Sequence, residues 1–169
     1  WMFMKDRFFA VAYHGTKKSF VGSILTKINF QHNVGDKFLG QGFYLWRDSY
    51  ERALVWKGVS SYPIEKEEKA VIYAKIEEQK NKTLNFTSYN WNQEKDLLRI
   101  YNDYFSEDIF FGEFIDMLIA KGLEINVVII ADLRKEPNII KIDDMHFAYT
   151  DIQICLKNDK PIVELLEVK

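Results

Sequence analysis

The sequence predicts an α+β fold in a single domain over residues 1–169, and three observations support this. Apolar residues recur at helical spacing in several stretches, which predicts amphipathic helices. Short runs rich in β-branched and aromatic residues lie both before and after those stretches, which predicts strands and helices in mixed order. With 47% apolar and 28% charged residues, the chain has a globular composition and the length of one domain.

The first third of the chain holds the most informative segments. Residues 8–13 predict a buried strand that runs into a polar turn at His14-Gly15-Thr16. Residues 20–28 have helical spacing. The polar loop that follows ends in Gly40-Gln41-Gly42, and its length and composition make it a candidate lid.

The rest of the chain alternates helices and strands. A helix is expected after Asp48 or Ser49, because either residue fits an N-cap, and it carries Ala53 and Trp56 toward the core. Two longer helices are expected at residues 91–104 and 111–119, the second closed by Gly122. Strands are expected at residues 43–46, 70–76, 83–86, 126–131, 138–142, 152–156 and 162–165.

Charge and cysteine content exclude several classes of protein. The net charge of −2 gives no whole-chain basic field of the kind that holds nucleic-acid phosphates. Cys155 is the single cysteine, so no disulfide forms within the chain, and no Cys and His residues lie at zinc spacing. The apolar runs are too short for a membrane span, and the start lacks the apolar region of a signal peptide. We therefore expect a cytoplasmic protein with no metal and no membrane contact.

Several short motifs follow one another in a fixed order. His14-Gly15-Thr16 comes first, Gly40-Gln41-Gly42-Phe43-Tyr44 follows, and Ala53 and Trp56 come next. In this order the sequence resembles the ADP-ribosyltransferases of the poly-ADP-ribose polymerase and diphtheria-toxin type, whose signature is His, Tyr and an acidic residue or Gln on three separated strands. The resemblance implies split mixed β-sheets flanked by helices, with NAD as co-substrate.

The resemblance also assigns roles to the first two motifs. Gly15 would present its backbone to the nicotinamide carboxamide, and His14 would hydrogen-bond the adenosine ribose. Thr16 would add a hydroxyl to the nicotinamide ribose, and Tyr44 would stack against the nicotinamide ring. The expected NAD-binding residues are therefore His14, Gly15, Thr16, Gly42, Phe43 and Tyr44, with Gly42 and Phe43 forming the bend that brings the aromatic strand under the ring.

The third signature element has two candidates, Asp151 and Gln153. Cleavage of the nicotinamide glycosidic bond passes through an oxocarbenium-like ribose, which a carboxylate stabilises. Strand alternation places both residues on one face. Asp151 would accept a bond from a ribose hydroxyl and stabilise positive charge, whereas Gln153 would orient the substrate without carrying charge. Both stay open, and with Tyr44 they are the expected catalytic residues.

The resemblance leaves three functions open. The first is a mono-ADP-ribosyltransferase with a protein or nucleic-acid acceptor, and Lys17-Lys18 beside the motif would suit a phosphate contact. The second is an inactive module that binds NAD or ADP-ribose, and the third is an NAD glycohydrolase that uses water as the acceptor. A small NAD-consuming domain would also suit a bacterial toxin or antiphage effector, with an inhibitor or antitoxin protein as partner.

Overall fold

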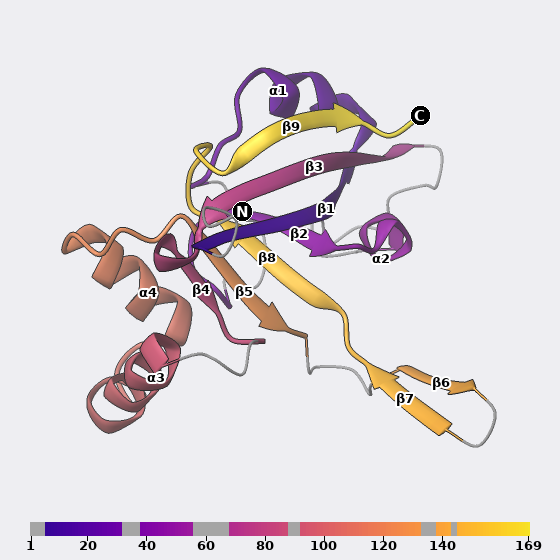
Figure 1. Cartoon of the computed structure of the whole chain (residues 1–169). Helices are drawn as coiled ribbons and strands as arrows, with labels where there is room; N and C mark the ends of the chain where they lie inside the picture. The colour runs from indigo at the N-terminus through magenta and orange to yellow at the C-terminus, as the bar shows by residue number, and fades with distance from the viewer. Residues whose placement is uncertain (1–5, 32–37, 56–67, 88–91, 133–137, 143–144) are drawn as a thin grey trace.

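The computed structural model describes residues 6–31, 38–55, 68–87, 92–132, 138–142 and 145–169. They form an α+β structure, as the sequence predicted (Figure 1). The helices are α1 (Val21–Thr26), α2 (Tyr50–Val55), α3 (Asn92–Tyr104) and α4 (Phe111–Ala120), with 3-10 turns η2 (Lys18–Phe20) and η4 (Lys80–Lys82). The strands are β1 (Arg7–Lys17), β2 (Phe43–Arg47), β3 (Lys69–Gln79), β4 (Thr83–Asn85), β5 (Val127–Ala131), β6 (Asn138–Ile142), β7 (Met145–Tyr149), β8 (Ile152–Leu156) and β9 (Ile162–Glu167).

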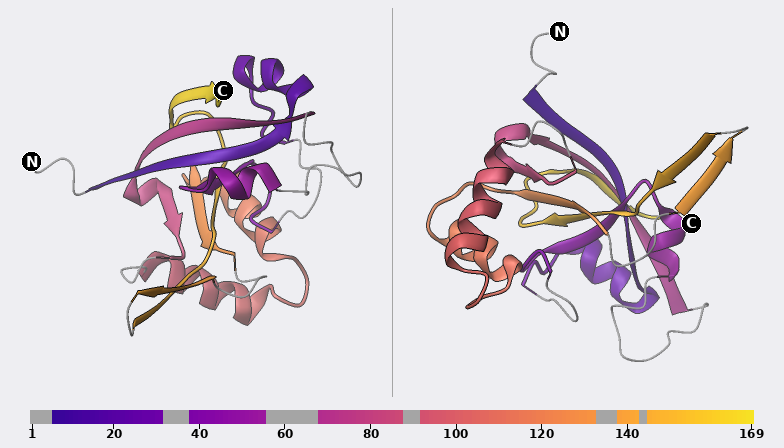
Figure 2. Two further views of the ribbon diagram at one scale, coloured as in Figure 1. Left: turned by 90° about the vertical axis from the view of Figure 1, so that its right-hand side faces the viewer. Right: turned by 90° about the horizontal axis from the view of Figure 1, so that it is seen from below.

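Seven of these strands form one mixed sheet in the order β4-β5-β8-β2-β1-β3-β9. β4 and β5 are parallel, and the other neighbours are antiparallel. β9, β3 and β1 run in a different direction from β8 and β5, so the sheet is strongly twisted (Figure 1). β6 and β7 form a separate hairpin that projects from the body of the molecule (Figure 2).

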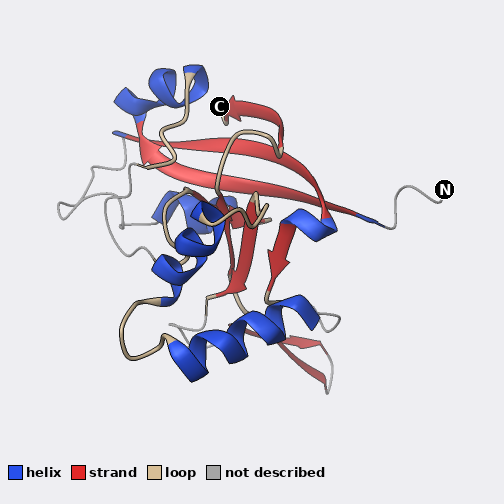
Figure 3. Cartoon of the chain, turned by 90° about the vertical axis from the view of Figure 1, so that its left-hand side faces the viewer, coloured by secondary structure: helices blue, strands red, loops and turns tan. Residues whose placement is uncertain are grey.

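Three apolar clusters hold the helices and the sheet together, and helices lie on either side of the strands (Figure 3). One cluster covers one face of the sheet, where Ile24 of α1 packs against strand residues. On the other face, α3 and α4 pack against β5 and β8 through Phe114 and Val128. On the same face α2 packs through Ala53 against Trp46 of β2.

The positions of the expected elements agree with the structure, with two exceptions. The expected turn at His14-Gly15-Thr16 was wrong, because these residues continue β1 and pair with β3 as far as Lys17. β3 pairs with β1 along its whole length and supplies backbone hydrogen bonds to these three residues. Because β3 lies far away in the sequence, the local sequence around His14 does not reveal this pairing. The second exception is β7, which the sequence did not predict. This short strand begins only three positions after the last residue of β6, so it resembles a connection between strands.

The start of α2 and the end of α4 agree with the expected capping residues. The Ser49 hydroxyl oxygen accepts a hydrogen bond from the Arg52 backbone N–H at 3.2 Å, so Ser49 rather than Asp48 caps α2. Gly122 follows α4 with a φ of +104°, a conformation that glycine adopts readily. No helix among the described residues is long and apolar enough to cross a membrane.

Candidate functional site

The candidate site lies where the pairing between β1 and β2 ends. The last paired residues along β1 toward its C-terminal end are Tyr13 and Trp46. One residue further, the His14 Nδ1 atom lies 2.7 Å from the backbone oxygen of Tyr44, so the imidazole takes up this β2 carbonyl group. The imidazole also packs on the Phe43 ring, with 4.2 Å between the ring centroids. At this point the His14 side chain, and not a further β1–β2 residue pair, contacts the β2 backbone.

The backbone of Gly15 faces β2 just beyond the last paired residues. The Val11 carbonyl oxygen accepts a hydrogen bond from the Asp48 N–H at 3.0 Å, so the polar backbone groups of Val11 point toward β2. The regular pairing of β1 with β3 keeps the strand alternation, so Gly15 presents its N–H and C=O to the same side. A neighbouring donor and acceptor of this kind is complementary to a primary carboxamide, which carries both.

The absence of a side chain at Gly15 has a structural cause as well. A Cβ atom at this position would run into the backbone carbonyl oxygen of Ala53 in α2. α2 can pack this closely only against glycine. Gly15 therefore allows α2 to pack against its Cα atom, and it also directs its backbone N–H and C=O toward β2.

His14 is neutral at pH 7 and has a defined tautomer. Burial lowers its pKa to about 4, and the hydrogen bond to the Tyr44 backbone opposes this shift in part. Because a carbonyl oxygen only accepts, Nδ1 carries the proton and Nε2 has a free lone pair as an acceptor. His14 is thus suited to receive a hydrogen bond from a hydroxyl group, such as one on a ribose.

The pKa of His14 predicts a pH dependence of stability. The unfolded state binds this proton near pH 6.5 and the folded state only near pH 4, so the contribution is complete above pH 6.5 and is lost as the pH falls through about 4. The loss amounts to at most about 3.5 kcal/mol, since one pKa unit corresponds to about 1.4 kcal/mol. In His14→Asn the amide keeps a donor for Tyr44 but does not titrate. Urea unfolding between pH 4 and 7 should therefore give a flatter profile for the variant, and identical profiles would contradict this assignment.

Tyr44 and Gln153 lie on the opposite face of the sheet from His14. Gln153 is paired with Trp46, and Tyr44 with Cys155, so Tyr44 and Gln153 are diagonal neighbours on adjacent strands. The Tyr44 ring packs with the apolar residues of α3 and α4, whereas Phe43 belongs to the cluster on the His14 face. The structure thus brings the predicted residues onto neighbouring strands but on two faces.

Gln153 is a buried polar residue whose side chain has no hydrogen-bond partner among the described residues. Only 4% of its surface is exposed, and its strand neighbours are Trp46 and Ile130. The amide atoms of Gln153 are not among the fully buried side-chain atoms that lack a partner in the described part of the chain, so water or a ligand can reach them. The two donors and the acceptor of this amide are therefore available to a ligand.

Asp151, the other candidate, is held in a cluster of charges. The Arg52 Nε atom lies 3.0 Å from Asp151 Oδ2, and a terminal nitrogen of Arg52 lies 3.6 Å from Asp132 Oδ2. The Arg52 guanidinium also lies over the Trp46 ring, 4.7 Å from its centroid. The exposed fractions of the three charged side chains are 12% for Arg52, 3% for Asp132 and 20% for Asp151. The Asp151 carboxylate is thus occupied by a protein partner, while the Gln153 amide is not.

Sequence reasoning did not identify Arg52 or Asp132. Neither residue belongs to a recognisable motif, and they lie 80 positions apart in the printed sequence. Asp132 directly follows β5 and Asp151 directly precedes β8, and the Asp132 N–H donates to the Asp151 carbonyl oxygen at 2.7 Å. The pairing of β5 with β8 brings the two carboxylates together, and that pairing was not part of the sequence prediction.

Gly42 and Thr16, two further predicted binding residues, lie in closely packed parts of the sheet. A side chain on Gly42 would collide with the Cys155 sulfur and the Leu156 carbonyl oxygen, so Gly42 allows β2 to approach β8. Burial raises the pKa of Cys155 to about 11, which keeps it a thiol at neutral pH. Thr16 is 4% exposed and shares a face of β1 with His14 by alternation.

Some expectations concern the surroundings of the site. Residues 32–37 of the expected lid loop lie outside the described residues. At its end, the Tyr44 hydroxyl accepts from the Leu39 N–H at 3.0 Å and donates to the Gly40 carbonyl oxygen at 2.7 Å. Lys18 is exposed at the end of β1, and Trp56 lies outside the described residues. Within the part of the chain that the structure describes, no cluster of His, Cys, Asp and Glu residues is placed to hold a metal ion.

Comparisons with known proteins add no relative. No protein-family model matches the sequence, and searches of curated proteins and of solved structures found no match.

Proposed function

We propose that this protein binds NAD where the β1–β2 pairing ends, cleaves its nicotinamide–ribose bond and transfers ADP-ribose to a macromolecular acceptor. One observation carries the proposal: the backbone N–H and C=O of Gly15 face β2 just where His14 takes the place of the strand ladder. This donor and acceptor pair matches a nicotinamide carboxamide. The sheet order β8-β2-β1 supports it, because segments distant in sequence become neighbours there.

Each residue then has a role that its local chemistry supports. Gly15 binds the carboxamide, and the free Nε2 of neutral His14 accepts from a ribose hydroxyl. Tyr44, whose hydroxyl is fixed by backbone groups, lies on the opposite face from His14, so the nicotinamide would reach its ring where the β1–β2 pairing has ended. The amide of Gln153, which has no hydrogen-bond partner among the described residues, hydrogen-bonds the nicotinamide ribose, while Asp151 stays with Arg52. When the glycosidic bond breaks, its electron pair leaves with nicotinamide, and the acceptor nucleophile bonds the ribose carbon and loses its proton.

The neutral Gln153 favours a second candidate function. Oxocarbenium-like ribose is stabilised best by a negative charge, and the nearby Asp151 carboxylate is paired with Arg52. A site of this kind would bind NAD or ADP-ribose but cleave it slowly, which describes a binding module. In either case we place the protein in the cytoplasm, where NAD is available, as an effector or toxin restrained by an inhibitor protein.

Incubation with NAD separates these functions. Nicotinamide release is followed with and without a cell lysate, and the proposal predicts release that depends on the lysate together with labelling of a protein or nucleic acid. Release without lysate, with free ADP-ribose as the product, would instead identify a glycohydrolase. Saturable NAD binding without release would identify the binding module, and neither binding nor release would contradict the whole proposal.

A further inference from the structure

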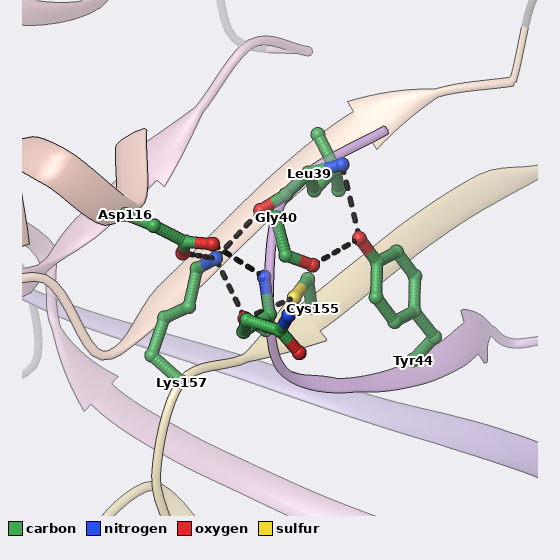
Figure 4. Close-up of polar contacts among 7 residues, drawn as sticks. Leu39, Gly40, Tyr44, Asp116, Cys155 and Lys157 are labelled. Carbon is green, nitrogen blue, oxygen red and sulfur yellow. Dashed lines mark hydrogen bonds and ion pairs between the residues drawn. The ribbon is translucent and has the colours of Figure 1, made fainter. Parts of the chain in front are cut away.

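The turn at residues 39–41, just before β2, is held by a buried cation (Figure 4). The Lys157 Nζ atom lies 2.6 Å from the Leu39 carbonyl oxygen and 2.8 Å from that of Gln41. Its third partner is the Oδ1 atom of Asp116 in α4, at 2.8 Å. An ammonium group has three N–H donors, and each has an acceptor here. The Lys157 side chain is 5% exposed, so these three contacts replace its hydration.

Asp116 holds the same turn through its second oxygen. Its Oδ2 atom accepts a hydrogen bond from the Gln41 backbone N–H at 2.6 Å. Gly40 has a φ of +79°, and a side chain there would come within 2.5 Å of both Asp116 Oδ2 and the Gly112 carbonyl oxygen. The turn therefore lies directly on α4 and needs glycine at its centre.

The Tyr44 hydroxyl completes this network from the other side. It donates to the Gly40 carbonyl oxygen and accepts from the Leu39 N–H, so both of its partners belong to the turn that Lys157 and Asp116 hold. Burial raises the pKa of Tyr44 above its usual range, which keeps the hydroxyl protonated and able to donate. The described contacts thus connect Lys157 with the Tyr44 hydroxyl through the turn (Figure 4).

We propose that Lys157 and Asp116 are positioning residues for Tyr44: they fix the turn at residues 39–41, and the turn fixes the phenol ring. This inference rests on the proposed function, in which that ring faces nicotinamide. A tyrosine without these hydroxyl contacts has to lose side-chain freedom when a ligand arrives, and ordering it in advance removes that cost from binding. Lys157 therefore increases NAD affinity without touching NAD.

Lys157→Met tests the inference, because it removes the ammonium group and keeps an apolar stem. Amide hydrogen exchange at Leu39 and Gln41 should accelerate at least about tenfold as the turn opens locally. The Kd for NAD, measured by calorimetry, should rise about tenfold, the scale of one well-placed aromatic contact. In a Tyr44→Leu background the same substitution should leave the Kd unchanged, because Lys157 acts through Tyr44. The matched control is Lys82→Met, whose partner Glu124 is exposed and which should alter none of these values.

A second variant and a rescue guard against a simple folding defect. Asp116→Asn keeps the shape of the side chain but places an N–H₂ group against either Lys157 or the Gln41 N–H, and it should weaken NAD binding in the same direction. In Lys157→Ala, added propylammonium should restore NAD affinity and slow exchange at Leu39, whereas tetramethylammonium, which has no N–H donor, should not.

The outcomes separate this inference from the proposed function. If Lys157→Met weakens NAD binding equally in the presence and absence of the Tyr44 ring, positioning through Tyr44 is overturned while NAD binding stands. Unchanged exchange at Leu39 and Gln41 in Lys157→Met would overturn the link between Lys157 and the turn. A wild-type protein that does not bind NAD would contradict the proposed function, and the inference would fall with it.

Discussion

Replacing Arg52 with methionine is expected to lower the free energy of unfolding by about 3–5 kcal/mol, because it removes the guanidinium group that contacts the carboxylates of both Asp132 and Asp151. All three side chains are largely buried, so water compensates poorly for the lost cation. Methionine keeps most of the apolar stem that lies on Trp46, which separates the effect of charge from that of packing. Urea unfolding at pH 7 measures the difference.

The chain offers a matched control for this substitution. Arg47 pairs with Asp48 at 3.3 Å, but the exposed fractions of these side chains are 32% and 69%. Arg47→Met should therefore change the free energy of unfolding by less than about 1 kcal/mol. If Arg52→Met and Arg47→Met lower the free energy of unfolding equally, burial does not make the Arg52 ion pairs more important than the exposed Arg47 pair.

Gln153→Met is expected to lower activity while changing stability little. Methionine fills a similar volume, and the amide atoms of Gln153 are not among the fully buried atoms that lack a partner in the described residues, so the free energy of unfolding should change by less than about 1.5 kcal/mol. Nicotinamide release should fall at least about a hundredfold, since an orienting amide at the ribose is then missing.

The two measurements on Gln153→Met carry separate conclusions. Unchanged stability with unchanged nicotinamide release would remove Gln153 from the site and make Asp151 the next candidate. Asp151→Asn serves as the comparison, because it weakens the ion pair with Arg52 and should destabilise the fold. A stable Asp151→Asn variant with no release of nicotinamide would make Asp151 the catalytic group.

The secondary structure could be predicted because its signals are local. The helical spacing of residues such as Phe111, Phe114 and Leu118 identifies α4, and a short run rich in β-forming residues identifies β8. The start of α2 was predictable from Ser49, because a capping hydroxyl lies next to the first turn of the helix in the sequence. Signals of this kind lie within a few residues of one another, so no knowledge of the fold is needed to read them.

The candidate site was only partly visible from sequence because its geometry depends on distant pairings. His14, Tyr44 and Gln153 were named from motifs, but which face each side chain takes follows from the register of β1, β2 and β8. The contacts of Lys157 with Asp116 and of Arg52 with Asp132 join segments with no local relation. Such pairs have no periodic signature, so only the folded chain reveals them.

The central claim is that the Gly15 backbone binds a carboxamide, and the amide resonance of Gly15 tests it most directly. Titrating the ¹⁵N-labelled protein with nicotinamide should shift the Gly15 resonance saturably, together with those of His14 and Tyr44. Nicotinic acid, which has a carboxylate and so lacks the amide donor, should shift them much less. An unmoved Gly15 resonance under saturating nicotinamide, or an equal response to nicotinic acid, would contradict the account.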